Sequence, residues 1–408
     1  MAMPDLLPLE EALRRVLRRA GARRTGRVAL AGAGGLRLAR EVRADRDQPP
    51  FDRATVDGYA VRSADPACGR EPLAVLETVF AGSRPRSTHR RGCAALVMTG
   101  APLPGGADAV VKREEVRLLG GGSFILMSRP RPGQGVHRRG SDARRGDPVL
   151  PAGTAVTPRV AAVLASLGAV RPSVFLPPRV AVGVTGDEVR PAGARRLPAA
   201  AIRNSNGPTL EALVRAAGGV PSPIGTARDR PGDLLRLVRR GLRAAEVLLL
   251  TGGVSAGDRD LVPAALRRAG VREVFHRVDL RPGKPVWFGV RGRTLVFGLP
   301  GNPVSAQATF ALLVAPALAA LRGDPEPGPR LLPARMEGGA PREGGRTAFR
   351  PARVRRARDG SLRARLVPWN GSGDFVGFAR ADALLRREGG AGPLQDGDPV
   401  QILLLDTP

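Results

Sequence analysis

Residues 246–260 read EVLLLTGGVSAGDRD, and this stretch decides the fold. Its aliphatic run is bounded by polar residues and glycines, which predicts a strand buried on both faces, because a half-exposed strand would alternate apolar and polar residues. The residues that follow, DLVPAALRRAG at 260–270, have helical spacing. A buried strand that leads into a helix through glycines, hydroxyls and carboxylates places a candidate functional loop between the two elements.

Two more strand-like runs, RVAVGVT at 179–185 and TLVFGL at 294–299, lie on either side of this stretch in the sequence. They alternate with helical patterns at 206–219, 232–245 and 305–323. Alternating strands and helices predict βαβ units, and therefore a parallel sheet with helices on both faces. We predict a three-layer α/β domain over residues 178–326.

The rest of the chain is predicted to form three further regions. The start is an amphipathic helix, and QPPF at 48–51 cannot be helical, so it marks a boundary. Short apolar runs between turns predict a β-rich module inserted at 49–139, after which a helix capped by Thr157 returns the chain to the first domain. We expect a discontinuous N-terminal domain of residues 1–48 and 140–177. Residues 327–408 are expected to form a small all-β domain without a helical stretch.

Composition restricts the class of protein. The formal net charge is +28, but arginines are scattered through every element and aromatic residues make up only 3% of the chain, so a nucleic-acid binder is disfavoured. Cys68 and Cys93 are too few for a disulfide framework or a four-ligand zinc site, which favours a reducing cytoplasm. We expect no signal peptide, and we expect that no apolar stretch approaches the roughly 18 residues of a membrane span.

The three strands all end in polar loops. The carboxyl ends of parallel strands lie along one edge of a sheet, where glycines and helix N-termini suit a phosphate. Carboxylates would repel that anion unless a divalent cation, Mg²⁺, bridged them to the phosphate oxygens. We therefore predict a magnesium site that includes Glu188, Asp258 and Asp260, with Asp187 beside it. The alternative is that Asp258 or Asp260 only caps the next helix.

A Pro-Gly turn carries one of only two lysines in the chain. Arg281 and Lys284 flank Pro282 and Gly283 between two predicted strands. Proline restricts the backbone and glycine permits the tight turn, so both cations are held on a stiff support. This arrangement predicts an oxyanion pocket; the alternative is a surface turn with ordinary charges.

Seven motifs occur together over nearly the whole chain. They are FDRATVDGYAV at 51–61, MTGAPLPGGADAVV at 98–111, HRRGSDARRGD at 137–147, VTGDE at 184–188, LTGGVSAGDRD at 250–260, LRPGKPVWFG at 280–289 and GLPGNPVSA at 298–306. In this order they resemble the MoeA family, the molybdopterin molybdenumtransferases, which include the E domain of gephyrin and of its plant counterpart.

The resemblance implies a fold and a reaction. The fold has an elongated N-terminal domain, a β module, the α/β domain and a C-terminal β barrel, and it forms homodimers whose clefts lie between the α/β domain of one subunit and the β module of the other. The reaction is the last step of molybdenum cofactor biosynthesis: adenylylated molybdopterin and molybdate combine with Mg²⁺, and AMP is released. Transient contact with the adenylyltransferase and with molybdoenzymes is also implied.

The resemblance assigns residues to this chemistry. The catalytic group would comprise Asp57, Asp142, Glu188, Asp258, Asp260 and Lys284. The substrate-binding group would comprise Thr99, Arg139, Asp187, Gly252, Gly253, Ser255, Arg281, Pro300, Gly301, Asn302, Pro303, Ser305 and Ser372. By this resemblance, the molybdate pocket would be formed by Arg281, Lys284 and Ser372. The residues that would reach the cleft from the partner subunit are Asp57, Thr99, Arg139 and Asp142.

The chain departs from the family pattern at three places. Arg281 stands where many members carry lysine, and Glu246 stands where an aspartate is often found. In the C-terminal domain Pro351 falls on the position expected for an arginine, with Arg350 and Arg353 as the candidates to replace it.

Two rival functions remain at this point. A non-catalytic paralogue acting as a molybdopterin-binding or scaffold protein is disfavoured because Asp57, Glu188, Asp258, Asp260 and Lys284 are all present. The adenylyltransferase that makes the substrate shares the α/β domain, but it would need neither the inserted β module nor the C-terminal all-β domain.

Overall fold

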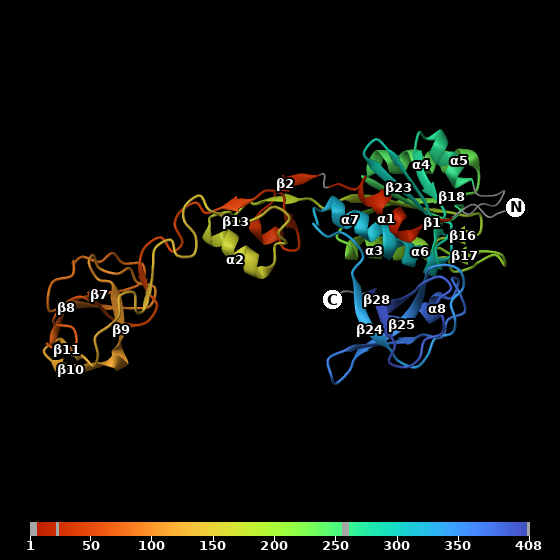
Figure 1. Cartoon of the computed structure of the whole chain (residues 1–408). Coiled ribbons are helices and arrows are strands. Elements are labelled where there is room, and N and C mark those ends of the chain that lie inside the picture. Colours follow the sequence, from red (N-terminus) through yellow and green to blue (C-terminus); the bar gives the residue numbers. More distant parts are fainter. Residues whose placement is uncertain (1–5, 22–23, 255–260, 406–408) are drawn as a thin grey trace. The chain divides into compact units, whose positions relative to one another are not determined.

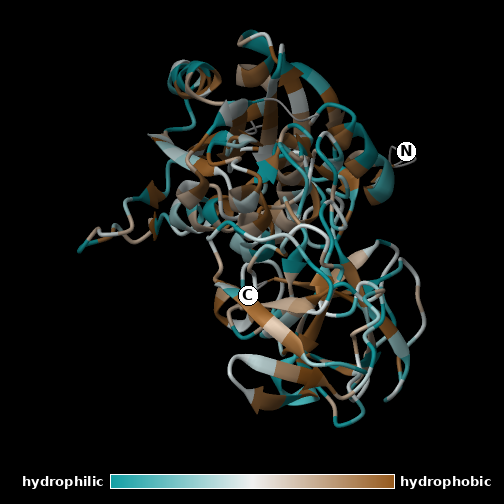
Figure 2. Ribbon diagram, turned by 90° about the vertical axis from the view of Figure 1, so that its left-hand side faces the viewer, coloured by the Kyte–Doolittle hydropathy of each residue, from teal (hydrophilic) through white to brown (hydrophobic). Residues whose placement is uncertain are grey.

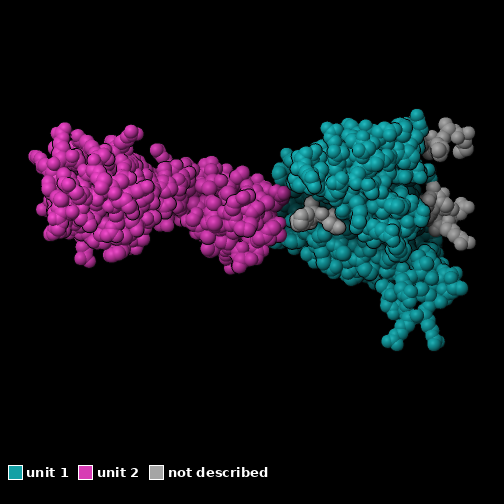
Figure 3. Space-filling model, turned by 90° about the horizontal axis from the view of Figure 1, so that it is seen from below, with its two compact units in different colours: residues 1–26, 173–408 teal, residues 27–172 magenta. Residues whose placement is uncertain are grey.

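A computed structural model describes residues 6–21, 24–254 and 261–405 (Figure 1). The chain divides into two compact units, residues 1–26 with 173–408 and residues 27–172 (Figure 3). Each unit is described separately below. The finer four-domain division of the sequence stays a prediction.

A six-stranded mixed sheet forms the centre of the larger unit. Its spatial order is β18 (Val220–Ala227), β15 (Arg179–Thr185), β19 (Val247–Thr251), β23 (Thr294–Leu299), β22 (Trp287–Arg291) and β20 (Arg272–His276). The first four strands are parallel, whereas β22 is antiparallel to both of its neighbours. All five residues of β19 are buried, as its uninterrupted aliphatic run predicted. The three predicted strands and the parallel arrangement at the centre of the sheet are confirmed.

Helices cover both faces of this sheet. The helices are α1 (Leu9–Leu17), α3 (Asn206–Ala216), α4 (Pro231–Ala244), α5 (Val262–Arg268), α6 (Pro303–Thr309), the π-helical turn η3 (Phe310–Val314) and α7 (Ala315–Leu321). One core cluster joins the sheet to α1, α3, α6, η3 and α7, and a second joins it to α4 and α5. This is the predicted three-layer α/β arrangement. In Figure 2 most hydrophobic stretches lie on strands and helices, and loops are mostly hydrophilic.

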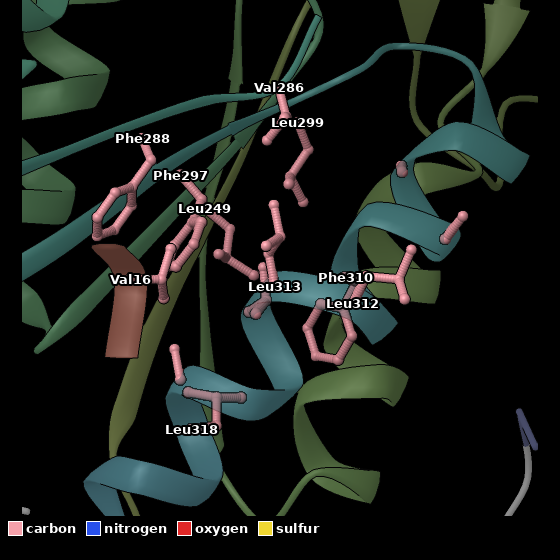
Figure 4. Packing of buried hydrophobic residues seen from close by; sticks show 14 of the residues in the cluster. Val16, Leu249, Val286, Phe288, Phe297, Leu299, Phe310, Leu312, Leu313 and Leu318 are labelled. Atoms are coloured by element: carbon pink, nitrogen blue, oxygen red, sulfur yellow. The ribbon is translucent and has the colours of Figure 1, made fainter. Parts of the chain in front are cut away.

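The first of these cores includes the N-terminal helix. Figure 4 shows Leu249, Phe288 and Phe297 reaching from the sheet toward Val16 of α1 and Leu313 of η3. Val16 is fully buried there. Helix α1 therefore packs in the unit that holds the sheet, although the sequence analysis groups residues 1–48 with 140–177.

Residues Pro303–Leu321 form one continuous apolar helix across α6, η3 and α7. By length and composition this helix is long enough to cross a membrane, which corrects the expectation that no apolar stretch approaches that length. Its most hydrophobic window is 78% buried inside the fold, as in the core helix of a globular domain.

The C-terminal region of the same unit is a closed barrel. Its strands, in order around the barrel, are β24 (Leu331–Met336), β26 (Leu362–Leu366), β25 (Ala348–Arg356), β27 (Ala383–Arg387) and β28 (Pro399–Leu404). The barrel confirms the expected all-β region. One short helix, α8 (Phe375–Phe378), interrupts it and was not expected; Asp374 caps this helix by accepting a hydrogen bond from the Gly377 amide at 2.8 Å.

Short strand pairs complete this unit. They are β1 (Leu7–Pro8) with β21 (Val278–Asp279), and β16 (Val189–Arg190) with β17 (Ile202–Arg203). Strands β2 (Thr25–Arg27) and β14 (Ser173–Phe175) lie where the chain passes between the two units.

The smaller unit, residues 27–172, contains a β-sheet within the range predicted for the β-rich module, and also a helical segment. Its six-stranded sheet has the order β10 (Val116–Gly120), β11 (Ser123–Leu126), β7 (Leu73–Val79), β8 (Cys93–Val97), β6 (Gly58–Val61) and β9 (Ala109–Lys112). The Tyr59 and Phe124 rings stack in its core. Helix α2 (Pro158–Ser166) begins after Thr157, whose hydroxyl accepts a hydrogen bond from the Val160 amide, so the predicted cap is confirmed.

The other elements of the smaller unit are short. They are η1 (Leu30–Gly32), β3 (Arg37–Leu38), β4 (Val42–Arg43) paired with β13 (Pro148–Leu150), β5 (Arg53–Ala54) paired with β12 (Val136–His137), and η2 (Arg113–Glu115).

Candidate functional site

Hydrogen bonds tie together the carboxyl ends of three parallel strands. The Asn206 side-chain amide donates to the Thr251 hydroxyl at 2.9 Å and to the Gly301 carbonyl at 2.7 Å. The Thr251 hydroxyl donates to the Pro300 carbonyl at 2.9 Å, and the Thr185 hydroxyl donates to the Thr251 carbonyl at 3.4 Å. The loops after β15, β19 and β23 are therefore held against one another at a single edge, as predicted. The sequence analysis did not single out Asn206, which is 9% exposed.

Gly252 allows these loops to approach closely. Its φ is +95°, and a Cβ at this position would lie 2.5 Å from the Thr185 carbonyl oxygen. A Cβ on Gly301 would lie 3.6 Å from the Gly252 Cα. A side chain at residue 252 would therefore force β15 and β19 apart at the point where both strands end.

Beside this edge lies a pocket of about 520 Å³ that we call the cation pocket. It is lined by Gly253, Val254, Arg281, Pro282, Gly283, Lys284, Pro285, Pro300, Gly301, Asn302, Ser305, Arg346, Trp369, Gly371 and Ser372. Eight of these were predicted site residues. The predicted residues Gly252 and Pro303 adjoin the lining without forming part of it. The described lining holds three cationic side chains and no carboxylate, so it suits an anion.

Backbone hydrogen bonds attach the 281–284 turn to the barrel. The Arg281 amide donates to the Thr347 carbonyl, and the Phe349 amide donates to the Arg281 carbonyl, both at 2.8 Å. Lys284 is half-buried, and among the described residues its ammonium group has no hydrogen-bond or ion-pair partner. The turn thus presents an unpaired cation from a fixed backbone.

The opposite wall of the cation pocket comes from two loops. The Asn302 side-chain amide donates to the Ser372 hydroxyl at 2.8 Å, and the Val304 amide donates to the Ser372 carbonyl at 3.3 Å. These bonds join the loop between β23 and α6 to the 371–372 segment of the barrel region. The structure therefore brings the predicted residues Ser372 and Asn302 together.

A buried acid, Glu343, pairs with an arginine that lines the cation pocket. Glu343 is 6% exposed, and its two carboxylate oxygens face Arg281 at 3.4 Å and Arg350 at 3.7 Å. The Arg281 side chain is 47% exposed and lines the pocket while it pairs with this acid. The charge of Arg281 is therefore partly balanced by Glu343, whereas no residue of the described ranges balances that of Lys284.

Asp187 and Glu188 line a second pocket, of about 580 Å³, which we call the acid pocket. Its other lining residues are Arg190, Pro198, Ala200, Ala201, Asp229 and Leu261. It shares no lining residue with the cation pocket. The sequence analysis expected the carboxylates and the anion cradle along one rim. Instead, Asp187 and Glu188 line the acid pocket, whereas Arg281 and Lys284 line the cation pocket.

The described residues on either side of positions 255–260 line different pockets. Val254 lines the cation pocket, Leu261 lines the acid pocket, and the Val262 amide donates to the Gly253 carbonyl at 3.3 Å. The predicted residues Ser255, Asp258 and Asp260 lie outside the described residues. Within the described ranges no group of three or more histidine, cysteine, aspartate or glutamate residues is arranged to hold a metal ion.

In the smaller unit, Asp57 and Thr99 form a local pair. One carboxylate oxygen of Asp57 accepts hydrogen bonds from the Thr99 hydroxyl and the Thr99 amide, both at 2.7 Å. The hydroxyl bond, followed by the amide bond, lowers the pKa of Asp57 below its ordinary value. The structure thus brings together two residues that the sequence analysis assigned separately.

Asp142 and Arg139 have different neighbours. His137 Nε2 lies 2.8 Å from an Asp142 carboxylate oxygen, and an Arg53 guanidinium nitrogen lies 3.1 Å from His137 Nδ1. Arginine has no acceptor, so Nδ1 accepts and the neutral ring carries its proton on Nε2, where it donates to Asp142. Arg139 Nε donates to Asp47 at 2.6 Å. His137 was not predicted as a site residue, because no local sequence pattern indicates its hydrogen bond to Asp142.

Replacing Thr99 with alanine is expected to raise the pKa of Asp57 toward the ordinary aspartate value of 3.8, because the strongest of its hydrogen bonds is lost. A depressed folded pKa stabilises the fold above the unfolded pKa, and that stabilisation is lost as the pH falls through the folded value. The stability lost in Thr99→Ala should therefore shrink at acid pH. Carboxyl ¹³C NMR titration of both proteins measures the shift; an unchanged Asp57 pKa would contradict the assignment.

Replacing Asn206 with alanine is expected to cost about 1–3 kcal/mol of unfolding free energy, because the Gly301 carbonyl and the Thr251 hydroxyl lose a buried donor. Urea denaturation followed by tryptophan fluorescence measures this loss. An Asn204→Ala variant serves as the control on the same segment: within the described part of the chain its side chain bonds to the nearby Gly207 amide alone, so a smaller loss is expected. Equal losses in the two variants would argue against a special role for Asn206.

Family models match the chain in three consecutive segments. The MoeA N-terminal region (domain I and II) matches residues 7–168, a "Probable molybdopterin binding domain" matches residues 181–320, and the MoeA C-terminal region (domain IV) matches residues 333–405. The middle match covers most of the α/β part with the strand-end loops, and the last covers the barrel. Fold and site together therefore define a multidomain transferase of molybdopterin chemistry.

Individual relatives cover the chain from end to end. The molybdopterin molybdenumtransferase of Bacillus subtilis (strain 168) is 32% identical over 406 residues, which is 98% of this chain and 94% of the relative. That of Synechococcus elongatus is 36% identical over 307 residues, 73% of this chain and 76% of the relative. A solved MoeA protein of Pyrococcus horikoshii, described as a molybdopterin biosynthesis protein, is 30% identical with a TM-score of 0.83, covering 98% of this chain and 100% of that structure. The chain belongs to the MoeA family of molybdopterin molybdenumtransferases, enzymes of molybdenum cofactor biosynthesis.

Proposed function

We propose that the chain inserts molybdate into adenylylated molybdopterin and releases AMP. The observation that carries this proposal is the cation pocket, which has three cationic side chains and no carboxylate in its described lining and adjoins the joined strand-end loops. Molybdate is a tetrahedral dianion and needs cations and hydrogen-bond donors. Lys284, Arg281 and the Ser372 hydroxyl supply both kinds of group.

The strand-end loops are proposed to hold the nucleotide and the pterin. Gly252 and Gly253 let the backbone approach a phosphate without a Cβ, and Asn206 fixes the loops against each other. Holding both substrates at a fixed separation lowers the entropic cost of the reaction, so positioning accounts for the catalysis without a protein nucleophile. Burial raises the pKa of the Cys68 thiol to about 11, so that thiol stays protonated at neutral pH.

Magnesium is proposed to act at the acid pocket. Asp187, Glu188 and Asp229 line that pocket, and carboxylate oxygens are the ligands that Mg²⁺ prefers. The described carboxylates form no three-ligand group by themselves, and we propose that Glu188 would hold the cation together with Asp258 and Asp260. When bound, Mg²⁺ would neutralise charge on the phosphate that leaves with AMP.

The residues of the smaller unit are proposed to act across a homodimer. Asp57, Thr99, Arg139 and Asp142 would then reach the cleft of the partner subunit. The hydrogen bond from His137 would hold the Asp142 carboxylate in place. We place the enzyme in the cytoplasm, where its two free cysteines stay reduced, with transient contacts to the adenylyltransferase and to molybdoenzymes.

A coupled assay tests this function. The purified protein is incubated with adenylylated molybdopterin, Mg²⁺ and molybdate, and AMP release and molybdenum incorporation are measured in the same samples. Both are expected to rise together, and both should fall when molybdate is omitted or Mg²⁺ is chelated. AMP release that does not depend on molybdate would contradict the proposal.

A further inference from the structure

The Asp142 carboxylate is held through one of its two oxygens. His137 Nε2 lies 2.8 Å from Oδ1, and the Ser141 hydroxyl donates to the same oxygen at 3.3 Å. Within the described ranges no group bonds to Oδ2, and the Asp142 side chain is 56% exposed. The carboxylate therefore has a fixed orientation and one oxygen left for a ligand.

Strands β5 and β12 determine the second partner of His137. The two strands are antiparallel, and Arg53 lies directly opposite His137 in their register. Because side chains at opposite positions project to the same face, the Arg53 guanidinium reaches His137 Nδ1 at 3.1 Å. Arginine can only donate, so Nδ1 accepts, and the proton of the neutral ring lies on Nε2, toward Asp142. Arg53 thus selects the tautomer in which His137 donates to the carboxylate.

The backbone around Asp142 is fixed without this side-chain contact. The Asp142 amide donates to the Gln48 carbonyl, and the Gly140 amide donates to the Pro49 carbonyl, both at 2.9 Å. A contact between two partly exposed polar side chains contributes little to the stability of a fold. Loss of the His137 side chain should therefore change the placement of the carboxylate much more than the stability of the unit.

Asp57 is anchored in the same manner. One of its oxygens accepts both hydrogen bonds from Thr99, and no described residue bonds to the other oxygen. Ala54 connects the two places, because its amide donates to the Ala101 carbonyl and it pairs with Val136 across β5 and β12. Each proposed catalytic carboxylate of the smaller unit thus has one oxygen fixed by neighbouring donors and one oxygen without a partner among the described residues.

We propose that His137 is a positioning residue for Asp142. It donates from Nε2 to Oδ1 in the tautomer that Arg53 selects, and it leaves Oδ2 for the substrate. This inference rests on the proposed function, in which Asp142 reaches the cleft of the partner subunit, and it adds two residues that act without touching the substrate. A carboxylate that is oriented before the substrate binds needs less ordering in the transition state.

Nitrogen NMR of the full-length protein tests the tautomer without any substrate. Long-range ¹H–¹⁵N correlation distinguishes a protonated ring nitrogen from a bare one, and the chain has only three histidines, so the signals lost in His137→Gln identify this ring. At mildly alkaline pH the proton is expected on Nε2, and Arg53→Met is expected to give a mixture of tautomers. A wild-type ring that carries a proton on Nδ1 would overturn the proposal.

The coupled assay tests the positioning role. His137→Phe is expected to lower the rate about five- to tenfold, within the usual range of coupling between residues in contact. His137→Gln, which places an amide donor near the position of Nε2, should recover part of this loss. Arg138→Ala is the matched control on the same segment, because Arg138 faces Asp52 at 3.8 Å, and its rate should stay within about twofold of the wild type.

A double-mutant cycle separates positioning from a general structural effect. In an Asp142→Ala background, His137→Phe should cause no further loss of rate, because its role is exerted through that carboxylate. The urea midpoint of His137→Phe should stay close to that of the wild type. A wild-type rate in a folded His137→Phe variant, an equal loss in Arg138→Ala, or a further loss in the Asp142→Ala background would overturn the role of His137 and leave the proposed function standing. Absence of AMP release by the wild type would overturn the proposed function, whereas the NMR experiment would still decide the hydrogen bond.

Discussion

Replacing Lys284 with alanine is expected to lower coupled AMP release and molybdenum incorporation at least about tenfold, which corresponds to about 1.4 kcal/mol of transition-state stabilisation. Lys284 lines the cation pocket, and among the described residues nothing pairs with its ammonium group. Its charge is thus available to the substrate rather than to the fold. The coupled assay under saturating adenylylated molybdopterin measures the effect, and the molybdate concentration that gives half-maximal rate is expected to rise.

Arg291→Ala provides the control for Lys284. Arg291 is an exposed cation at the far end of β22, the strand that follows the 281–284 turn. Its replacement removes one positive charge seven residues from Lys284 at a position that does not line the cation pocket. Near wild-type activity in Lys284→Ala would contradict a role for this lysine, and an equal loss in Arg291→Ala would show that net charge, rather than the pocket, is responsible.

Replacing Phe297 with alanine is expected to cost about 3–5 kcal/mol of unfolding free energy, the usual range for removing a buried aromatic ring. Phe297 is fully buried in β23, and its ring centroid lies 4.8 Å from that of Phe288 (Figure 4). Both tryptophans of the chain, Trp287 and Trp369, belong to the larger unit, so their fluorescence reports its unfolding in urea.

Val220→Ala is the control for Phe297. Val220 lies on β18 at the edge of the same sheet and is 50% exposed, so its truncation should cost less than about 1 kcal/mol. A loss below about 1 kcal/mol in Phe297→Ala would contradict the described packing. Because β23 leads into the Pro300–Asn302 loop of the cation pocket, the destabilised variant should also lose activity at temperatures where the wild type stays folded.

The sequence predicted those parts of the fold that depend on local patterns. The aliphatic run that ends at Thr251 predicts a strand buried on both faces, and every residue of β19 is buried. Glycine, proline and hydroxyl residues directly after the strands predict the loops that form the site. The Pro-Gly turn predicts the rigid placement of Arg281 and Lys284, and both line the cation pocket.

Contacts between residues that lie far apart in the sequence could not be predicted from it. Asn206 joins loops that lie 45 and 95 residues away in sequence, and Glu343 reaches Arg281 across 62 residues. No local pattern marks either contact. The sequence also predicted a single site where the structure has two pockets. The sequence shows that each loop follows a strand, but the path of the loop in the folded protein decides which pocket it lines.

Anomalous diffraction from crystals soaked in molybdate tests the central claim most directly, because it locates the molybdenum atom without assuming any residue's role. A single strong peak is predicted in the cation pocket, within contact of Lys284, Arg346 and Ser372. A peak confined to another part of the molecule, or no peak at molybdate concentrations that saturate the coupled assay, would contradict the account.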